Sequence, residues 1–285
     1  MRVAFLGPAG TFSEEALRSS DAAAGAEAVP FGSIHEAVVA VQDQAVDRAL
    51  VPIENALEGG VSATLDALAA DAPDVVVVGE RVLAIRTCLV ARGALELDAI
   101  ELVVSHPQPL AQCARFLRAT LPGTRVRAAT STAEAVREVV GSDQRWAALG
   151  PRGAAERYGA RVLREGIDDE PGNATRFVWL ARSGAEPLAA SAAAAWKTSV
   201  LFAGAGDAQP GWLVRCLSEF AFRGVNLTRI ESRPRRSRLG HYIFHIDLEG
   251  DAREPRVADA VAGLHAHCEE VRLLGSYPVA GPPSG

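Results

Sequence analysis

Paired cysteines are missing from this sequence. Its four cysteines are scattered, and no two have the C-x-x-C spacing of a zinc site or a redox pair; they are Cys88, Cys113, Cys216 and Cys268. This pattern favours reduced thiols in a cytoplasmic protein, with neither disulfide bonds nor a bound metal. His265, His267 and Cys268 form a poor ligand cluster, because side chains two apart on a helix point to different faces.

The sequence also lacks an excess of positive charge. Its 29 Lys and Arg face 35 Asp and Glu, a net charge of −6, which argues against general binding to nucleic acid or an anionic membrane. The basic run at residues 233–238 is interpreted as a solvated loop between strands. Residues 1–7 begin a strand-like run that is too short for a signal peptide or a membrane span.

A cofactor motif is absent as well. The turn around Gly7 and Gly10 lacks the further glycine of the dinucleotide fingerprint and the lysine of a Walker loop. No cofactor is therefore expected. The turn lies between a strand and a helix start, where free backbone N–H groups and the helix dipole favour an anion. Thr11 and Ser13 would be its hydroxyls, although Ser13 could equally just cap the helix.

What is present indicates an α/β protein of two domains. The chain has 285 residues, of which 48% are apolar and 22% charged. Up to residue 182, short apolar strands alternate with helices, which predicts a largely parallel sheet order. Residues 75–78 and 81–90 are expected to be consecutive strands, one of them a crossover between two lobes. The Ala-rich residues 183–196 are predicted to be a linker.

After the linker the pattern changes to strand, helix, strand, strand, helix and strand, which is the ferredoxin-like βαββαβ order. The expected elements are residues 198–202, 210–222, 227–231, 241–248, 256–267 and 271–277. No residue set in this half looks catalytic, so we expect it to bind or regulate.

Three further polar stretches lie at strand ends, where α/β proteins place their ligands. They are Pro52–Asn55, Ser105–Pro109 and Asn173–Phe177. Two sheets facing across a cleft would bring these stretches together. Taken alone, Asn55 could instead build an Asx turn and His106 could be structural.

Together these stretches resemble prephenate dehydratase with a C-terminal ACT regulatory domain, over nearly the whole chain. The resemblance rests on five motifs in the family's order: Gly7–Ser13, Pro52–Asn55, Ser105–Pro109, Asn173–Phe177 and Glu231–Pro234. It implies a two-lobed catalytic domain similar to type II periplasmic binding proteins at residues 1–182, with a second lobe at about 80–159. The ACT domain would span residues 197–279, followed by a tail at 280–285.

The implied activity is that of a carbon–oxygen lyase, which converts prephenate to phenylpyruvate in phenylalanine biosynthesis. Aromatisation supplies most of the driving force, so neither a metal nor an organic cofactor is needed. The implied catalytic residues are Thr175, Glu54, Asn55 and Gln108. The implied substrate-binding residues are Thr11, Ser13, Ser105, His106, Asn173, Arg176 and Phe177.

The chemistry suggests roles for these residues. Thr175 would donate a hydrogen bond to the leaving hydroxyl, and Phe177 would form an apolar wall for the ring. Arg176 could pair with a substrate carboxylate or brace its own loop. An ionised Glu54 would repel a dianion, so we expect it to be protonated through burial or turned to hold Asn55. His106 is an alternative acid.

For the C-terminal half, the resemblance implies inhibition by L-phenylalanine bound between paired domains of a homodimer or homotetramer. The implied effector residues are Gly211, Trp212, Leu213, Val214, Asn226, Glu231, Ser232, Arg233 and Pro234. Trp212 stands where the family usually has alanine, and its indole could cap the pocket, shrink it or face the partner domain. The alternatives to the implied function are an arogenate dehydratase and a non-catalytic amino-acid sensor.

Overall fold

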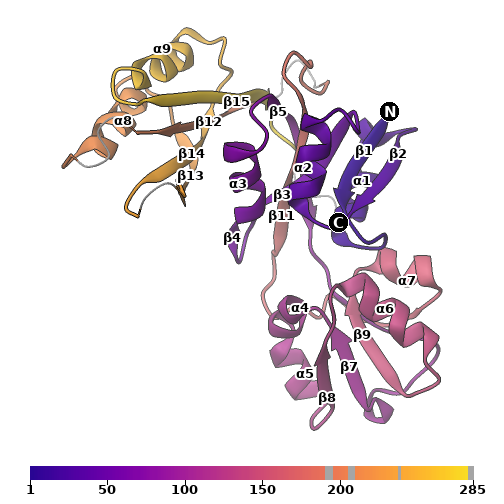
Figure 1. The fold of residues 1–285 in the computed structure, drawn as a ribbon. Coiled ribbons are helices and arrows are strands. Elements are labelled where there is room, and N and C mark those ends of the chain that lie inside the picture. Colours follow the sequence, from indigo (N-terminus) through magenta and orange to yellow (C-terminus); the bar gives the residue numbers. More distant parts are fainter. Residues whose placement is uncertain (190–194, 205–208, 237–238, 282–285) are drawn as a thin grey trace.

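The computed structural model describes residues 1–189, 195–204, 209–236 and 239–281 and shows three units (Figure 1). The first lobe is built on a six-stranded sheet with the order β2-β1-β3-β11-β5 and β4 paired to β3. Its strands are β1 (Arg2–Leu6), β2 (Glu27–Phe31), β3 (Arg48–Asn55), β4 (Gly59–Gly60), β5 (Val75–Ala84) and β11 (Ala174–Arg182).

Helices cover both faces of this sheet. The helix α1 (Phe12–Arg18) packs through Leu17 into a core with Phe177 and Trp179. On the opposite face, α2 (Ile34–Gln42) and α3 (Ser62–Ala70) pack against Val178 and Leu180. Successive residues of β11 therefore enter opposite cores, as strand pleating requires.

The second lobe has a five-stranded sheet with the order β10-β6-β9-β7-β8. Its strands are β6 (Cys88–Ala91), β7 (Leu102–Ser105), β8 (Arg125–Ala128), β9 (Trp146–Gly150) and β10 (Arg161–Glu165). Its α-helices are α4 (Pro107–Gln112), α5 (Ala114–Thr120), α6 (Thr132–Gly141) and α7 (Arg152–Tyr158). Because β10 pairs with β6, the sheet extends past residue 159, where we expected the lobe to end.

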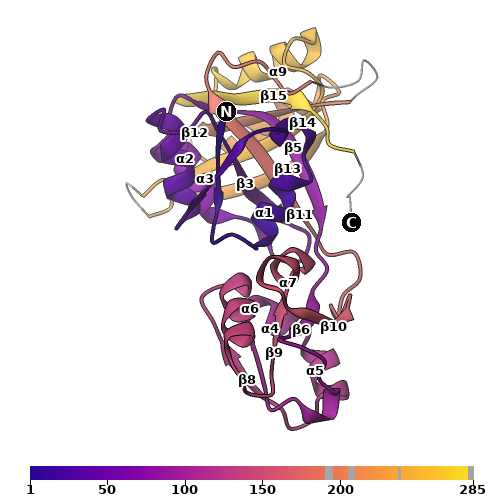
Figure 2. The same ribbon diagram turned by 90° about the vertical axis from the view of Figure 1, so that its right-hand side faces the viewer.

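Two crossovers join the lobes, one after β5 and one before β11. They are tied together where the Asp168 carboxylate accepts hydrogen bonds from the Thr87 N–H and hydroxyl, both at 2.7 Å. The expected largely parallel order is wrong for both sheets, because β11 runs antiparallel to β3 and β5, and β6 runs antiparallel to β9. Figure 2 shows the lobes separated along this pair of connections.

The C-terminal domain has the expected βαββαβ order and an antiparallel sheet, β13-β14-β12-β15. Its elements are β12 (Trp196–Ala203), α8 (Trp212–Ala221), β13 (Leu227–Pro234), β14 (Tyr242–Glu249), α9 (Pro255–Leu264) and β15 (Glu270–Pro278). Both helices cover one sheet face. The other face packs on the first lobe, where Leu201, Ile243 and Leu274 surround Ala69 of α3.

The linker prediction is tested only in part, because residues 190–194 lie outside the described residues, as do 282–285 of the expected tail. Before residue 190, the Leu188 N–H donates to the Val78 carbonyl at 2.7 Å, so the start of the expected linker is hydrogen-bonded to β5. Among the described residues, no helix is long and apolar enough to span a membrane.

Candidate active site

A cleft of about 900 Å³ lies between the two lobes. It is lined by many of the residues that the sequence singled out, from both lobes: Thr11, Ser13, Asn55, His106, Gln108, Asn173, Thr175 and Phe177. The N-terminal residues of β11 and the C-terminal residue of β3 meet the helix starts of both lobes here. The expectation that separate strand ends would converge on one site therefore holds for these residues.

Helix N-termini surround the cleft. Thr11 precedes α1, Val61 precedes α3, His106 precedes α4 and Ser131 precedes α6, and all four line the cavity. Unpaired N–H groups and the positive ends of helix dipoles attract anions. Among the described residues that line the cleft there is no Lys or Arg. Anion binding here would thus depend on neutral donors and helix ends.

Asn55 and Thr175 form the most constrained pair in the cleft. The Asn55 Oδ1 accepts hydrogen bonds from the Leu57 and Glu58 N–H groups at 2.9 and 3.1 Å. Because a backbone N–H can only donate, these bonds orient the amide so that Nδ2 donates to Thr175 Oγ1 at 3.0 Å. The Thr175 oxygen is thereby used as an acceptor, and its proton has no acceptor among the described residues. The hydroxyl can donate into the cleft.

A chain of amides extends this pair across the cleft. Asn55 Nδ2 also donates to Asn173 Oδ1 at 2.9 Å, and Asn173 Nδ2 donates to Gln112 Oε1 at 3.4 Å. Gln112 in turn donates to the Glu58 carboxylate at 3.3 Å. Gln112 belongs to the second lobe and Glu58 to the first, so the chain couples lobe position to the orientation of Asn55.

His106 is both the N-cap of α4 and a cleft residue. Its Nδ1 accepts from the Gln108 N–H at 3.4 Å, so the neutral ring carries its proton on Nε2. A hydrogen-bond donor is therefore available at the start of α4. Ser105 differs from the expectation, because it is fully buried outside the cleft lining and donates to the Leu149 carbonyl at 2.8 Å. It holds β7 against β9.

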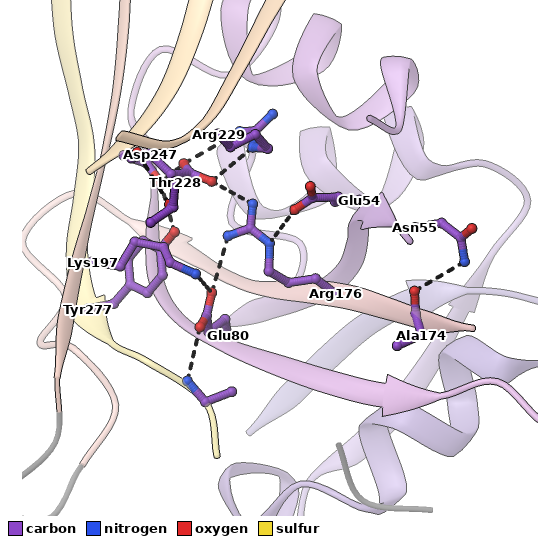
Figure 3. Close-up of polar contacts among 12 residues, drawn as sticks. Glu54, Asn55, Glu80, Ala174, Arg176, Lys197, Thr228, Arg229, Asp247 and Tyr277 are labelled. Carbon is purple, nitrogen blue, oxygen red and sulfur yellow. Dashed lines mark hydrogen bonds and ion pairs between the residues drawn. The ribbon is translucent and has the colours of Figure 1, made fainter. Parts of the chain in front are cut away.

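Glu54 and Arg176 also lie outside the cleft lining, which corrects our expectation that they face the substrate. They point to the opposite face of the sheet, toward the C-terminal domain (Figure 3). The Arg176 guanidinium donates to Glu54 at 3.1 Å, to Glu80 at 3.2 Å and to Asp247 at 2.5 Å. Strand alternation is the cause, since Thr175 and Phe177 occupy the cleft face.

The pKa values of Arg176 and Asp247 are shifted away from their ordinary values. Burial alone would lower the pKa of Arg176, but the carboxylates of Asp247 and Glu80 raise it above its ordinary value. Burial alone would raise the pKa of Asp247, but the Arg229 and Arg176 guanidinium groups lower it below its usual range. Both groups therefore remain charged inside the protein.

Sequence reasoning missed part of the cleft. Thr130, Ser131 and Thr132 line it, although we treated this stretch only as a helix start. Ser131 does cap α6, where its Oγ accepts from the Glu134 N–H at 3.0 Å. The signal available was the same one as at residues 7–13, a strand followed by hydroxyl residues and a helix.

The expected effector residues fall into two separate places. Gly211–Val214, at the start of α8, line a cavity of about 260 Å³ with Tyr242 and Phe244, whereas Glu231–Pro234 lie on the edge strand β13. Asn226 is exposed and precedes β13.

Trp212 faces the core of its own domain. It is buried, and its Nε1 donates to the His267 carbonyl at 2.6 Å. Its ring lies 5.8 Å from that of Phe244, and both rings contribute to the hydrophobic core of the domain. The indole thus lines the cavity from the core side.

Comparisons with known proteins agree on one family. The prephenate dehydratase family matches residues 3–185. A prephenate dehydratase of Amycolatopsis methanolica is 40% identical over 97% of this chain and 88% of its own. The solved structure of a prephenate dehydratase from Arthrobacter aurescens in complex with L-Phe is 42% identical, with a TM-score of 0.88 over 97% of this chain and 90% of its own. The structure of GqqA, described as a novel type of quorum-quenching acylase, is 27% identical over 98% of each chain, with a TM-score of 0.83.

Proposed function

The chain belongs to the prephenate dehydratase family, and we propose that it converts prephenate to phenylpyruvate for phenylalanine biosynthesis, as a carbon–oxygen lyase. One observation carries this proposal: the Thr175 hydroxyl accepts a hydrogen bond from Asn55 and keeps its proton free in a cleft ringed by helix N-termini.

The reaction needs a bound dianion and help for a departing hydroxyl. The helix N-termini and neutral donors such as Gln108 would hold the two carboxylates, and Phe177 would lie against the ring. As the ring carboxylate leaves as carbon dioxide, its C–C bond electrons enter the ring and the C–O bond breaks. Thr175 would donate a hydrogen bond to the departing oxygen, which takes up a proton and leaves as water.

A threonine hydroxyl is too weak an acid to supply that proton permanently. His106 lines the same cleft and would be the better source in its imidazolium form, because the neutral ring is itself a very weak acid. Thr175 would then act on the transition state through its hydrogen bond, and His106 or water would complete the proton transfer. Arogenate carries an amino group in place of the keto oxygen of prephenate, so the assay includes both substrates.

Substitution of Thr175 tests the proposal. We expect Thr175→Ala to lower kcat for phenylpyruvate formation by about 10²- to 10⁴-fold, and Thr175→Ser to retain much of it. Arogenate is assayed in parallel, and circular dichroism controls for folding. A folded alanine variant with near-normal kcat would refute the role of Thr175. A wild-type protein inert on both substrates would instead favour the amino-acid sensor.

For the C-terminal domain, we propose an ACT domain that binds L-phenylalanine and inhibits the enzyme. The βαββαβ order and the similarity to the Arthrobacter protein, which was solved with L-Phe, support this. Because Glu231–Pro234 are not among the described residues that line the cavity at Gly211–Val214, we propose that a second copy completes the site. Exposed apolar side chains on these elements, Val214 and Ile230, would be covered in a homodimer or homotetramer.

A phenylalanine titration of activity, paired with sedimentation analysis, tests this proposal. Inhibition by an oligomer would support it. Unchanged activity over a wide range of phenylalanine concentrations would reject the effector. A monomer that is still inhibited would reject the shared site.

A further inference from the structure

Two consecutive cross-strand pairs join β3 to β11 and use opposite faces of the sheet. Thr175 is paired with Asn55, and Arg176 with Glu54. On the cleft face, Asn55 donates to the Thr175 hydroxyl. On the back face, Arg176 donates to the Glu54 carboxylate at 3.1 Å. The back-face ion pair and the catalytic hydrogen bond therefore depend on the same strand register.

That register is interrupted immediately afterwards. Phe177 pairs with Pro52, so β3 carries one extra residue between the two parts of the ladder. A bulge of this kind disrupts the local hydrogen bonding and bends the strand. The long ladder beyond Phe177 therefore does not by itself fix the alignment of Thr175 with Asn55. Side-chain contacts at Arg176 are positioned to do so.

Arg176 is held from the C-terminal domain. Asp247 on β14 is fully buried and accepts from Arg176 at 2.5 Å, from Arg229 at 2.8 Å and from the Ser199 hydroxyl at 2.6 Å. Glu80 accepts from Arg176 and, at 2.9 Å, from Lys197 of β12. Figure 3 shows Asp247, Arg229, Glu80 and Lys197 around the guanidinium.

This cluster is balanced in charge. The cations Arg176, Arg229 and Lys197 are linked to the anions Glu54, Glu80 and Asp247. A buried cluster of charges is stable only when its geometry is well satisfied, and the loss of one member leaves its partner uncompensated. The position of the Arg176 guanidinium is therefore sensitive to each carboxylate, including the one from the other domain.

We propose that Arg176 is a positioning residue for Thr175, and that Asp247 contributes to the catalytic site through it. The C-terminal domain then helps to align the Thr175–Asn55 pair, although none of the residues described for this domain lines the cleft. Arg229 donates to the same Asp247 carboxylate, and it belongs to strand β13, which carries the expected effector residues Glu231–Pro234. This inference rests on the proposed function.

The test compares Asp247→Asn with a matched control in the full-length protein. We expect Asp247→Asn to lower kcat by about 10- to 100-fold, because small displacements of reacting groups are costly. The KM should change little, since the helix N-termini that would bind substrate are untouched. The control is Asp66→Asn, which removes the carboxylate that Arg233 and Arg236 contact across the same domain interface at 2.8 and 2.7 Å. It should leave kcat near the wild-type value.

Two further variants keep the test decisive if Asp247→Asn does not fold. Asp247→Glu keeps the charge and should retain more kcat than Asp247→Asn. Glu54→Gln alters the more exposed end of the cluster, where the carboxylate side chain is 38% exposed, and should lower kcat with the KM preserved. If both residues act through Arg176, combining Asp247→Asn with Glu54→Gln should lower kcat less than the product of the single effects.

Wild-type kcat in folded Asp247→Asn and Glu54→Gln would overturn the inference. Equal losses in Asp247→Asn and Asp66→Asn would overturn it too, since they would reflect a loosened interface only. A wild-type protein without turnover would refute the proposed function alone. In that event, a crystal structure of Asp247→Asn decides: separation of Thr175 Oγ1 from Asn55 Nδ2 supports the inference, and an unchanged hydrogen bond overturns it.

Discussion

His245 makes the stability of the protein depend on pH. It is fully buried on β14, next to the interface with the first lobe, and neither ring nitrogen has a hydrogen-bond partner among the described residues. Burial, followed by the guanidinium groups of Arg229 and Arg272, lowers the pKa of His245 from 6.5 to about 3, although Asp247 and Asp66 oppose the shift. The folded protein therefore holds this ring neutral.

The sign and size of the effect follow from proton linkage. Below about pH 6.5 the unfolded chain binds a proton at His245, whereas the folded chain keeps this ring neutral down to about pH 3. The free energy of unfolding therefore decreases as the pH falls through this range. A folded pKa of about 3 and an unfolded pKa of 6.5 give a loss of about 2 kcal/mol in the free energy of unfolding between pH 7 and pH 5. That is a large part of an ordinary domain's stability.

Urea unfolding at pH 7, 6 and 5, followed by circular dichroism, measures this loss. The variant His245→Gln has no titrating ring. Between pH 7 and pH 5 its free energy of unfolding should therefore fall by about 2 kcal/mol less than that of the wild type. The control is His265→Gln at an exposed position after α9, which should keep the wild-type dependence. Equal dependence in the wild type and His245→Gln would refute the reasoning.

Two further substitutions test single contacts. Ser105→Ala should lower the free energy of unfolding by about 1–2 kcal/mol and leave kcat unchanged, because the hydroxyl holds the buried Leu149 carbonyl outside the cleft; a large loss of kcat in folded protein would return Ser105 to the site. Trp212→Phe should destabilise the protein by about 1–3 kcal/mol, because it leaves the His267 carbonyl without its indole donor; an unchanged urea midpoint would contradict this.

The sequence predicted which residues lie near the cleft better than it predicted which face of the sheet each side chain occupies. Polar residues at strand ends pointed to Asn55, His106 and Thr175, and the structure brings them together. The alternation in Thr175-Arg176-Phe177 already implied that Arg176 faces away from its neighbours. Periodicity could not predict the partner of Arg176 on the other face, because Asp247 lies 71 residues further along the chain, in the sheet of another domain.

Other differences have the same origin in long-range contacts. Strand β11 lies antiparallel between β3 and β5 because the chain returns to the first lobe after forming the second. Local sequence patterns do not predict such a return. Thr130–Thr132 were overlooked as cleft residues because their capping role explained their composition locally. Trp212 lines the cavity at the expected effector residues, but the partner of its indole N–H, the His267 carbonyl 55 residues further along the chain, could not be predicted locally.

Arg176 lies on the back face of the sheet, and no Lys or Arg is among the described residues that line the cleft, which fits the proposed chemistry. Arginines in the cleft would bind substrate and transition state alike, and such uniform binding does not raise kcat. Hydroxyl and amide donors can instead be aimed at the single oxygen on which charge develops, as Asn55 aims Thr175. The back face can use full charges, because there the task is to hold β11 in place. Under the proposed function, Arg176 and Thr175 are thus adjacent in sequence and opposite in role: one would fix the strand, and the other would act on the substrate.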